Sequence, residues 1–164
     1  MSVNRNKPHV VIIPEDDENR QIVNGFVNHA GISLNQIRVK QPAGGWIKAV
    51  EQAGQELKEA NARAVAVIDF DDNDRRYEDA IERIPEGLRD RVAIVGCRKE
   101  PVDLRRAKLG SLEEIGGQLA EGRYSGSPTI WEHELLSHNA GEIGRVRQTL
   151  CPLLFASRKP REWL

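Results

Sequence analysis

The strongest indication of the fold comes from Ala64-Val-Ala-Val-Ile-Asp-Phe-Asp-Asp-Asn-Asp74, where a short apolar run leads directly into acidic residues. The run from Ala64 to Ile68 does not alternate with polar residues, which is typical of a strand buried on both faces of a parallel sheet. No turn residue separates Ile68 from Asp69. We therefore expect the carboxylate of Asp69 to lie where this strand ends.

Three further segments have strand character, and helical segments separate them. The strands are residues 9–14, 37–39 and 91–95, and apolar residues recur at helical spacing in 19–30, 46–57 and 77–88. Strands that alternate with helices predict βαβ units with right-handed crossovers. We expect an α/β fold, a Rossmann-like three-layer sandwich around a mainly parallel four-stranded sheet. The runs from Val10 and Ala64 are the most continuously apolar, so we place them side by side at its centre.

The sequence after residue 96 is less regular and predicts C-terminal helices. Residues 111–122 favour one helix, with Ser111 and Glu114 as a capping box. Residues 129–154 favour further helix, in two segments separated near residues 139–141. We expect one domain over residues 1–164, with a βα core at 9–96 and a helical extension at 97–164 that packs on it.

Composition excludes several classes of protein. The chain has 164 residues and a net charge of −1, so it cannot hold nucleic acid by bulk charge alone. Its two cysteines, Cys97 and Cys151, do not form a C-x-x-C pair, which disfavours a zinc site or a disulfide framework. The start lacks the apolar run of a signal peptide, and no stretch approaches the roughly 20 apolar residues of a membrane span. We expect a cytoplasmic protein with no membrane partner.

Acidic residues follow two of the strands. Ligands of open α/β sheets bind outside the carboxyl ends of the strands. Glu15 follows the first strand and Asp69 the third, and Asp71 would point the same way as Asp69 in extended chain. Clustered carboxylates repel one another, and a bound cation relieves that repulsion. We expect Glu15, Asp69 and Asp71 to bind Mg²⁺ or Mn²⁺ and to act in catalysis.

The neighbouring acids have a simpler interpretation. Asp16, Asp17 and Asp72 are expected to be helix caps or solvated loop residues. A separate substrate-binding feature is the turn at Gly44 and Gly45, followed by Lys48. Backbone amides at a helix start bind phosphate, and a lysine adds a cation, so these three residues are the candidates for substrate binding. The alternative is that the Gly-Gly pair only makes a turn, which is its more common role.

A glutamate after the first strand and an Asp-x-Asp after the third, in a β-α-β-α-β-α-β chain, resemble the Toprim domain of topoisomerases, primases and phage-defence nucleases. The resemblance spans residues 9–96 and implies that Glu15, Asp69 and Asp71 bind Mg²⁺ for strand cleavage or nucleotidyl transfer, with Glu15 as a metal ligand or a general base. It implies nucleic acid as the partner. One departure is that Asp16-Asp-Glu18 follows Glu15, where many Toprim sequences have a glycine. Other stretches, such as Ala43-Gly-Gly-Trp46, resemble small bacterial proteins, and that likeness adds no chemistry.

Two alternatives remain open from the sequence. The chain also resembles the receiver domain of two-component signalling, in which Asp69 or Asp71 would accept a phosphoryl group. Receivers have a hydroxyl residue at the end of the fourth strand and a lysine on a fifth, whereas Gly96-Cys97 ends the fourth strand here. The second alternative is a non-catalytic binding or assembly module. Its apolar C-terminal segment would cover a protein partner or a second copy of the chain.

Overall fold

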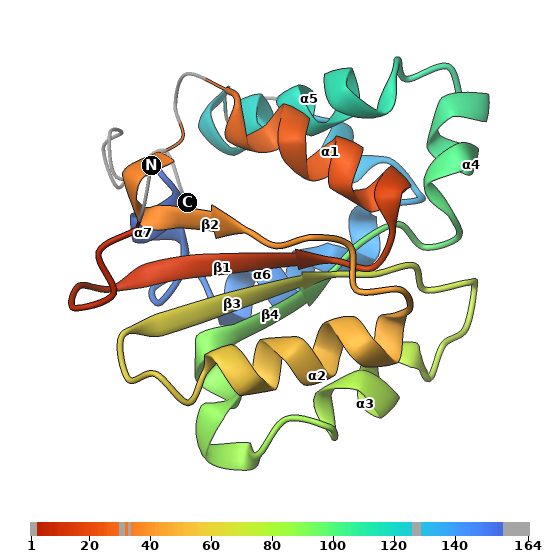
Figure 1. The fold of residues 1–164 in the computed structure, drawn as a ribbon. Helices are drawn as coiled ribbons and strands as arrows, with labels where there is room; N and C mark the ends of the chain where they lie inside the picture. The colour runs from red at the N-terminus through yellow and green to blue at the C-terminus, as the bar shows by residue number, and fades with distance from the viewer. Residues whose placement is uncertain (1–2, 30–31, 33, 126–128, 156–164) are drawn as a thin grey trace.

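The computed structural model describes residues 3–29, 32, 34–125 and 129–155. Four parallel strands form the sheet in the order β2-β1-β3-β4, where the strands are β1 (His9–Pro14), β2 (Ile37–Val39), β3 (Ala62–Val67) and β4 (Val92–Val95). The strands from Val10 and Ala64 are therefore adjacent at the centre, as predicted (Figure 1). Every residue of β1 is buried, which explains why its sequence is apolar without alternation.

Helices cover both faces of the sheet and make the predicted three-layer α/β sandwich. Helices α1 (Asp17–Val27) and α5 (Leu112–Ser125) lie over one face, and α2 (Trp46–Glu56) and α3 (Arg76–Ile81) lie over the other (Figure 1). Val10 and Ile12 of β1 pack into the cluster on the α1 side, and Val11 and Ile13 pack into the cluster on the α2 side. Successive side chains of a strand point to opposite faces of the sheet, so one apolar run contributes to both hydrophobic cores.

Helices α1 and α5 contact each other backbone to backbone. A Cβ atom built on Gly25 of α1 would stand 1.9 Å from the carbonyl oxygen of Glu113. A Cβ atom on Gly116 of α5 would stand 1.9 Å from the carbonyl oxygen of Ile22. The two glycines therefore allow an approach that any larger residue would prevent.

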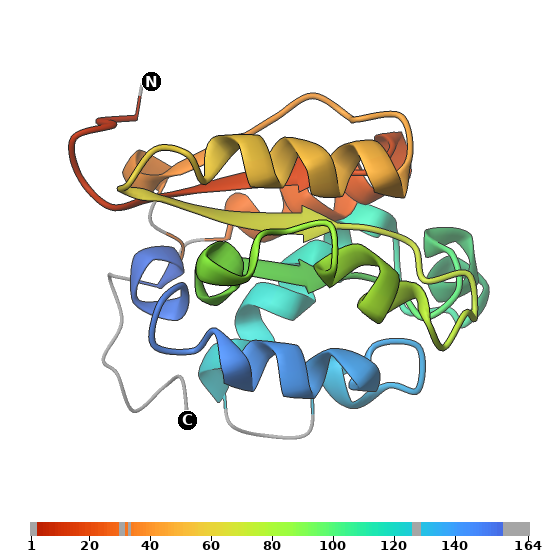
Figure 2. The same cartoon turned by 90° about the horizontal axis from the view of Figure 1, so that it is seen from below.

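The outer edge of β4 is covered by side chains and not by another strand. The helix α6 (Ala140–Arg145) runs beside this edge (Figure 2). Glu142 accepts from the backbone N–H of Ile94 at 2.8 Å, and Arg145 donates to the carbonyl oxygen of Val92 at 2.6 Å. Asn139 accepts from the N–H of Gly96 at 3.1 Å and donates to its carbonyl oxygen at 2.9 Å. These three side chains, spaced three residues apart, form hydrogen bonds with backbone groups at the edge of β4 that could otherwise pair with a strand of another chain.

The first helix after β3 is shorter than predicted. The helix expected to reach Leu88 ends at Ile81, and a 3-10 helix, η2 (Glu86–Arg91), follows Pro85. Proline disfavours helical geometry in the residue before it, which accounts for the break. The helix expected at 111–122 forms as α5, and its capping box is present, with Glu114 N–H donating to Ser111 Oγ at 3.1 Å.

The prediction of long helices over residues 129–154 is wrong. This segment contains η3 (Ile130–Glu132), η4 (Ser137–Asn139), α6 and α7 (Cys151–Leu154). Its backbone is used in tertiary contacts instead, since the carbonyl oxygen of Leu135 accepts from the N–H of Arg98 at 2.7 Å. Two further short elements were not predicted: η1 (Leu34–Gln36) and α4 (Pro101–Arg106). None of the helices in the described residues is long and apolar enough to cross a membrane.

Candidate metal centre

Three carboxylates meet where β1 and β3 end. In the order β2-β1-β3-β4, the chain adds β2 on one side of β1 and β3 on the other. The carboxyl ends of β1 and β3 are therefore the topological switch point of the sheet. The N–H of Glu15 donates to the carbonyl oxygen of Val67 at 2.9 Å and extends the β1–β3 pairing beyond the strands. One carboxylate oxygen from each of Glu15, Asp16 and Asp69 lies within 4.8 Å of the others. The prediction that acids of the first and third strands converge is therefore confirmed for Glu15 and Asp69.

Asp16 has two roles in this arrangement. It is the N-cap of α1, and its Oδ1 accepts from the backbone N–H of Asn19 at 2.9 Å, as the helix-cap interpretation predicted. The same oxygen also accepts from the Asn19 side-chain amide at 3.0 Å. The cap thereby fixes the Asp16 carboxylate beside Glu15 and Asp69.

Asp69 is the most deeply buried of the three acids, with 6% of its surface exposed. The pKa of Asp69 is raised from 3.8 to about 7. Burial is the largest cause, the hydrogen bond from Asn19 opposes it, and the charges of Glu15, Asp16 and Asp71 add to it. That bond joins Asn19 Nδ2 to Asp69 Oδ1 at 2.9 Å. Without a counter-charge, this carboxyl holds its proton up to neutral pH.

Glu15 is tied to the same strand end. Its Oε2 accepts from the backbone N–H of Asp69 at 2.6 Å. Burial also raises the pKa of Glu15, and the neighbouring Asp16 and Asp71 add to this, although the Asp69 N–H and Arg76 lower it. Two adjacent acids with raised pKa values at one edge of the sheet are the electrostatic pattern of a functional site.

Asp71 does not lie with the other three. The chain leaves the extended conformation after Phe70, and Asp71 and Asp72 have φ angles of 49° and 57°. The expectation that Asp69 and Asp71 point the same way is therefore wrong, because it assumed extended backbone. The Asp71 carboxylate instead accepts from Arg76 Nη1 at 3.0 Å. Its charge still raises the pKa of Glu15 and of Asp69.

Arg76 places a fixed positive charge beside the acids. Its Nη1 donates to the carbonyl oxygen of Asp69 at 2.7 Å as well as to Asp71. The guanidinium lies over the Trp46 ring, 4.7 Å from the ring centroid. Its Nε and Nη2 make no hydrogen bond to any residue that the structure describes. Arg76 thus has unused donors while its position is held by three contacts.

The glycine turn is close to the site but its amides are used within the protein. The N–H groups of Gly44 and Gly45 donate to the carbonyl oxygen of Glu15 at 2.9 and 3.3 Å. They therefore hold the start of α2 against the end of β1 and are not free for a phosphate. The next amides, from Trp46 to Lys48, belong to the first turn of α2, where no helical carbonyl precedes them. The Lys48 side chain is exposed.

Sequence reasoning missed Asp16 as a cluster member and missed Asn19 and Arg76 altogether. The spacing Asp16-x-x-Asn19 is that of a helix cap, and this signal was present in the sequence. It did not indicate that the asparagine side chain would bridge Asp16 and Asp69. Nothing in the sequence distinguishes Arg76 from the adjacent Arg75.

The donor set fits a hard divalent cation. All three close groups are carboxylates, which Mg²⁺, Mn²⁺ and Ca²⁺ prefer. Their oxygens lie within a span that one ion contacts after small side-chain adjustments. A cation would also remove the repulsion that raises the pKa of Glu15 and Asp69.

Comparison of the chain with protein-family models, with curated proteins and with solved structures gives no match.

Proposed function

We propose that this protein binds Mg²⁺ or Mn²⁺ at Glu15, Asp16 and Asp69 and uses the ion in phosphoryl transfer, as a nuclease that acts on nucleic acid. The observation that carries the proposal is the convergence of three carboxylates at the switch point of a parallel sheet. Glu15 and Asp69 both have raised pKa values, so each destabilises the metal-free protein as it ionises, and such acids are found preferentially at functional sites.

A bound divalent cation would neutralise the carboxylates and polarise a phosphodiester. The protein's own groups would position both. Asn19 orients Asp16 and Asp69 through one amide nitrogen, and the Asp69 N–H holds Glu15. Asp71 is not one of the three clustered carboxylates, and it contributes a negative charge beside them.

Two features support a phosphorylated substrate. Arg76 has unused guanidinium donors beside the acids, and arginine binds phosphate through such donors. The first turn of α2 also begins next to Glu15, and amides at a helix N-terminus bind anions. These two groups replace the Gly44 and Gly45 amides as the candidate phosphate contacts, and Lys48 adds charge at the same turn.

The Toprim resemblance supports the same chemistry through Glu15 and Asp69. In the extended geometry that the resemblance implies, Asp71 would be the third ligand. In the present geometry Asp16 takes that place, and Asp71 is paired with Arg76. Site-directed variants therefore separate the two ligand sets.

The test is nicking of supercoiled plasmid with Mg²⁺ or Mn²⁺, with and without EDTA. Wild type should nick only with metal, and Glu15→Gln, Asp16→Asn and Asp69→Asn should each lose most of the rate. Asp72→Asn is the matched control, because Asp72 is exposed and paired with Arg98. Equal nicking by all variants would mean contamination, and no nicking with any metal would reject the nuclease proposal.

A receiver-like phospho-acceptor is the second candidate, and the sheet order favours it. The order β2-β1-β3-β4 is that of the flavodoxin-like doubly wound fold, 2-1-3-4-5, to which receivers belong, without the fifth strand. Against it, β4 is followed by Gly96 and Cys97 in place of a hydroxyl residue. Acetyl phosphate separates the candidates: a covalent phosphoryl group on Asp69, seen by mass spectrometry, would favour the receiver.

A further inference from the structure

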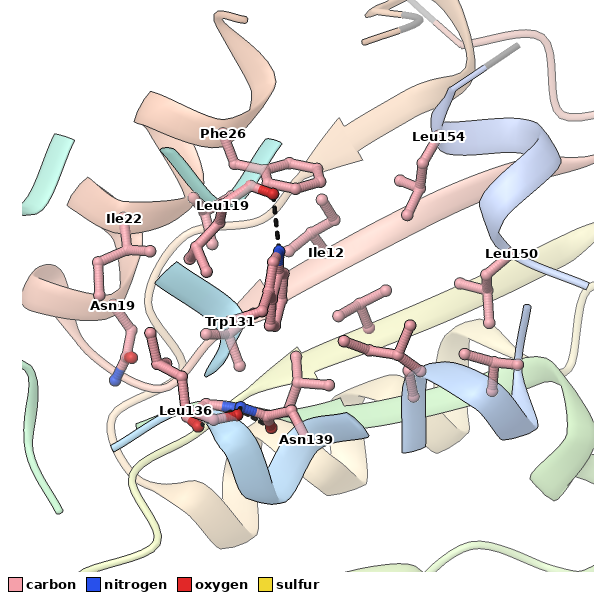
Figure 3. A pocket seen from close by; sticks show the side chains of 18 of the residues that line it. Ile12, Asn19, Ile22, Phe26, Leu119, Trp131, Leu136, Asn139, Leu150 and Leu154 are labelled. Atoms are coloured by element: carbon pink, nitrogen blue, oxygen red, sulfur yellow. Dashed lines mark hydrogen bonds between the residues drawn. The ribbon is translucent and has the colours of Figure 1, made fainter. Parts of the chain in front are cut away.

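A cavity of about 130 Å³ lies inside the protein between the sheet and the helices on its α1 side (Figure 3). Its walls come from β1, β3 and β4, from α1 and α5, and from residues 131–155. Most lining side chains are apolar, among them Ile12, Val67, Phe26 and Leu150. The metal-binding and phosphate-binding groups proposed above do not use this space.

Polar side chains at the cavity wall form hydrogen bonds within the protein, but one buried oxygen atom does not. Trp131 Nε1 donates to the carbonyl oxygen of Leu119 at 2.8 Å, and both groups of the Asn139 amide are bonded to Gly96. Cys97 Sγ donates to the carbonyl oxygen of Glu100 at 3.3 Å. Asn19 Oδ1 is fully buried and accepts no hydrogen bond from any described residue.

The orientation of the Asn19 amide is determined by the acids. Its Nδ2 donates to Asp16 Oδ1 and to Asp69 Oδ1. A flipped amide would turn its oxygen toward Asp16 Oδ1, which already accepts from the Asn19 backbone N–H, so the nitrogen must face the acids and the oxygen must face the other way. Asn19 lines the cavity, and Figure 3 shows it at one end of the group of lining side chains, beside Ile22.

We propose that this cavity binds a small aromatic or aliphatic molecule that carries a single N–H or O–H donor, with the donor bonded to Asn19 Oδ1. The volume is close to the roughly 150 Å³ of an engineered apolar cavity that admits benzene. A buried acceptor without a partner costs free energy, and a ligand donor would recover it. The lining offers no charge to compensate an ionised ligand, which restricts the class to neutral molecules.

The experiment measures the binding of two ligands, phenol and toluene, to two full-length proteins, wild type and Asn19→Leu. Phenol carries the donor, and toluene has a methyl group in its place. Binding is followed by calorimetry and by the NMR signal of the Trp131 indole N–H, identified with Trp131→Phe. Wild type should bind both saturably at one site. In Asn19→Leu the affinity for phenol, relative to that for toluene, should fall by about tenfold, because only phenol loses a hydrogen bond.

Ala93→Ile is the second variant and does not touch the acids. Ala93 lines the cavity from β4, and the larger side chain should fill it, abolish phenol binding and leave the protein folded. The proposal would be overturned if wild type binds neither ligand up to its solubility, or if Ala93→Ile binds phenol as wild type does. An unchanged phenol-to-toluene ratio in Asn19→Leu would overturn the assignment of Asn19 Oδ1 as the acceptor.

Discussion

Replacement of Asp69 by asparagine should stabilise the metal-free protein at pH 8 and have much less effect at pH 5. The Asp69 carboxyl is buried among Glu15, Asp16 and Asp71, and its pKa is about 7 in the folded protein against 3.8 in an ordinary carboxyl. Because the folded-state pKa is the higher one, the folded protein is penalised as pH rises from 3.8 to about 7. Asparagine has no such penalty, and its oxygen still accepts from Asn19.

The magnitude follows from linkage. Each pH unit between the two pKa values costs the folded state about 1.4 kcal/mol. Between pH 5 and the folded-state pKa of about 7 there are about two such units, and above pH 7 the penalty is constant. The stability of Asp69→Asn relative to wild type should therefore rise by about 3 kcal/mol from pH 5 to pH 8.

Urea unfolding in EDTA at pH 5, 6, 7 and 8 measures this difference. Asp72→Asn is the control, since Asp72 is 58% exposed and its ion pair with Arg98 lies at the surface. Such pairs contribute less than about 1 kcal/mol and should give a difference nearly independent of pH in this range. A flat profile for Asp69→Asn would mean that Asp69 ionises like an ordinary carboxyl, and the electrostatic account of the site would be wrong.

Three other predictions concern packing and the boundary of the site. Gly25→Ala should destabilise the protein by about 1 to 3 kcal/mol in urea unfolding, because its Cβ would clash with the Glu113 carbonyl, whereas Gly141→Ala, with open space around it, should be neutral or stabilising. Glu142→Gln should cost about 2 to 4 kcal/mol in the same assay, because both carboxylate oxygens accept hydrogen bonds at the β4 edge; a cost below 0.5 kcal/mol would contradict that role. Asp71→Asn should weaken Mn²⁺ binding, measured by calorimetry, by less than tenfold, because Asp71 acts on the cluster through charge alone; complete loss would make it a ligand.

The central sheet and the meeting of Glu15 with Asp69 were predictable because both depend on local pattern. Continuous apolar runs define buried parallel strands, and acids directly after them must lie at the carboxyl edge. The position of Asp71 was not predictable in the same way. Two successive residues with positive φ turn its side chain away, and neither is a glycine that would have indicated such a turn.

The C-terminal segment shows a different limit of sequence reasoning. Its apolar residues are spaced like those of a helix, yet Asn139, Glu142 and Arg145 serve the open edge of β4. Such contacts join residues about 40 to 50 positions apart, and no local pattern specifies them. The same applies to Asn19, whose side chain links the cap of α1 to the end of β3.

The most direct test of the proposed metal centre is calorimetric titration of the metal-free protein with Mn²⁺ at pH 6 and pH 8. Wild type should bind one ion or more at pH 8 and bind more weakly at pH 6, because Asp69 then has to release its proton. Glu15→Gln, Asp16→Asn and Asp69→Asn should each lose the high-affinity site, and Asp72→Asn should retain it. Equal binding by Asp69→Asn and wild type at pH 8 would contradict the assignment of this cluster as a metal centre.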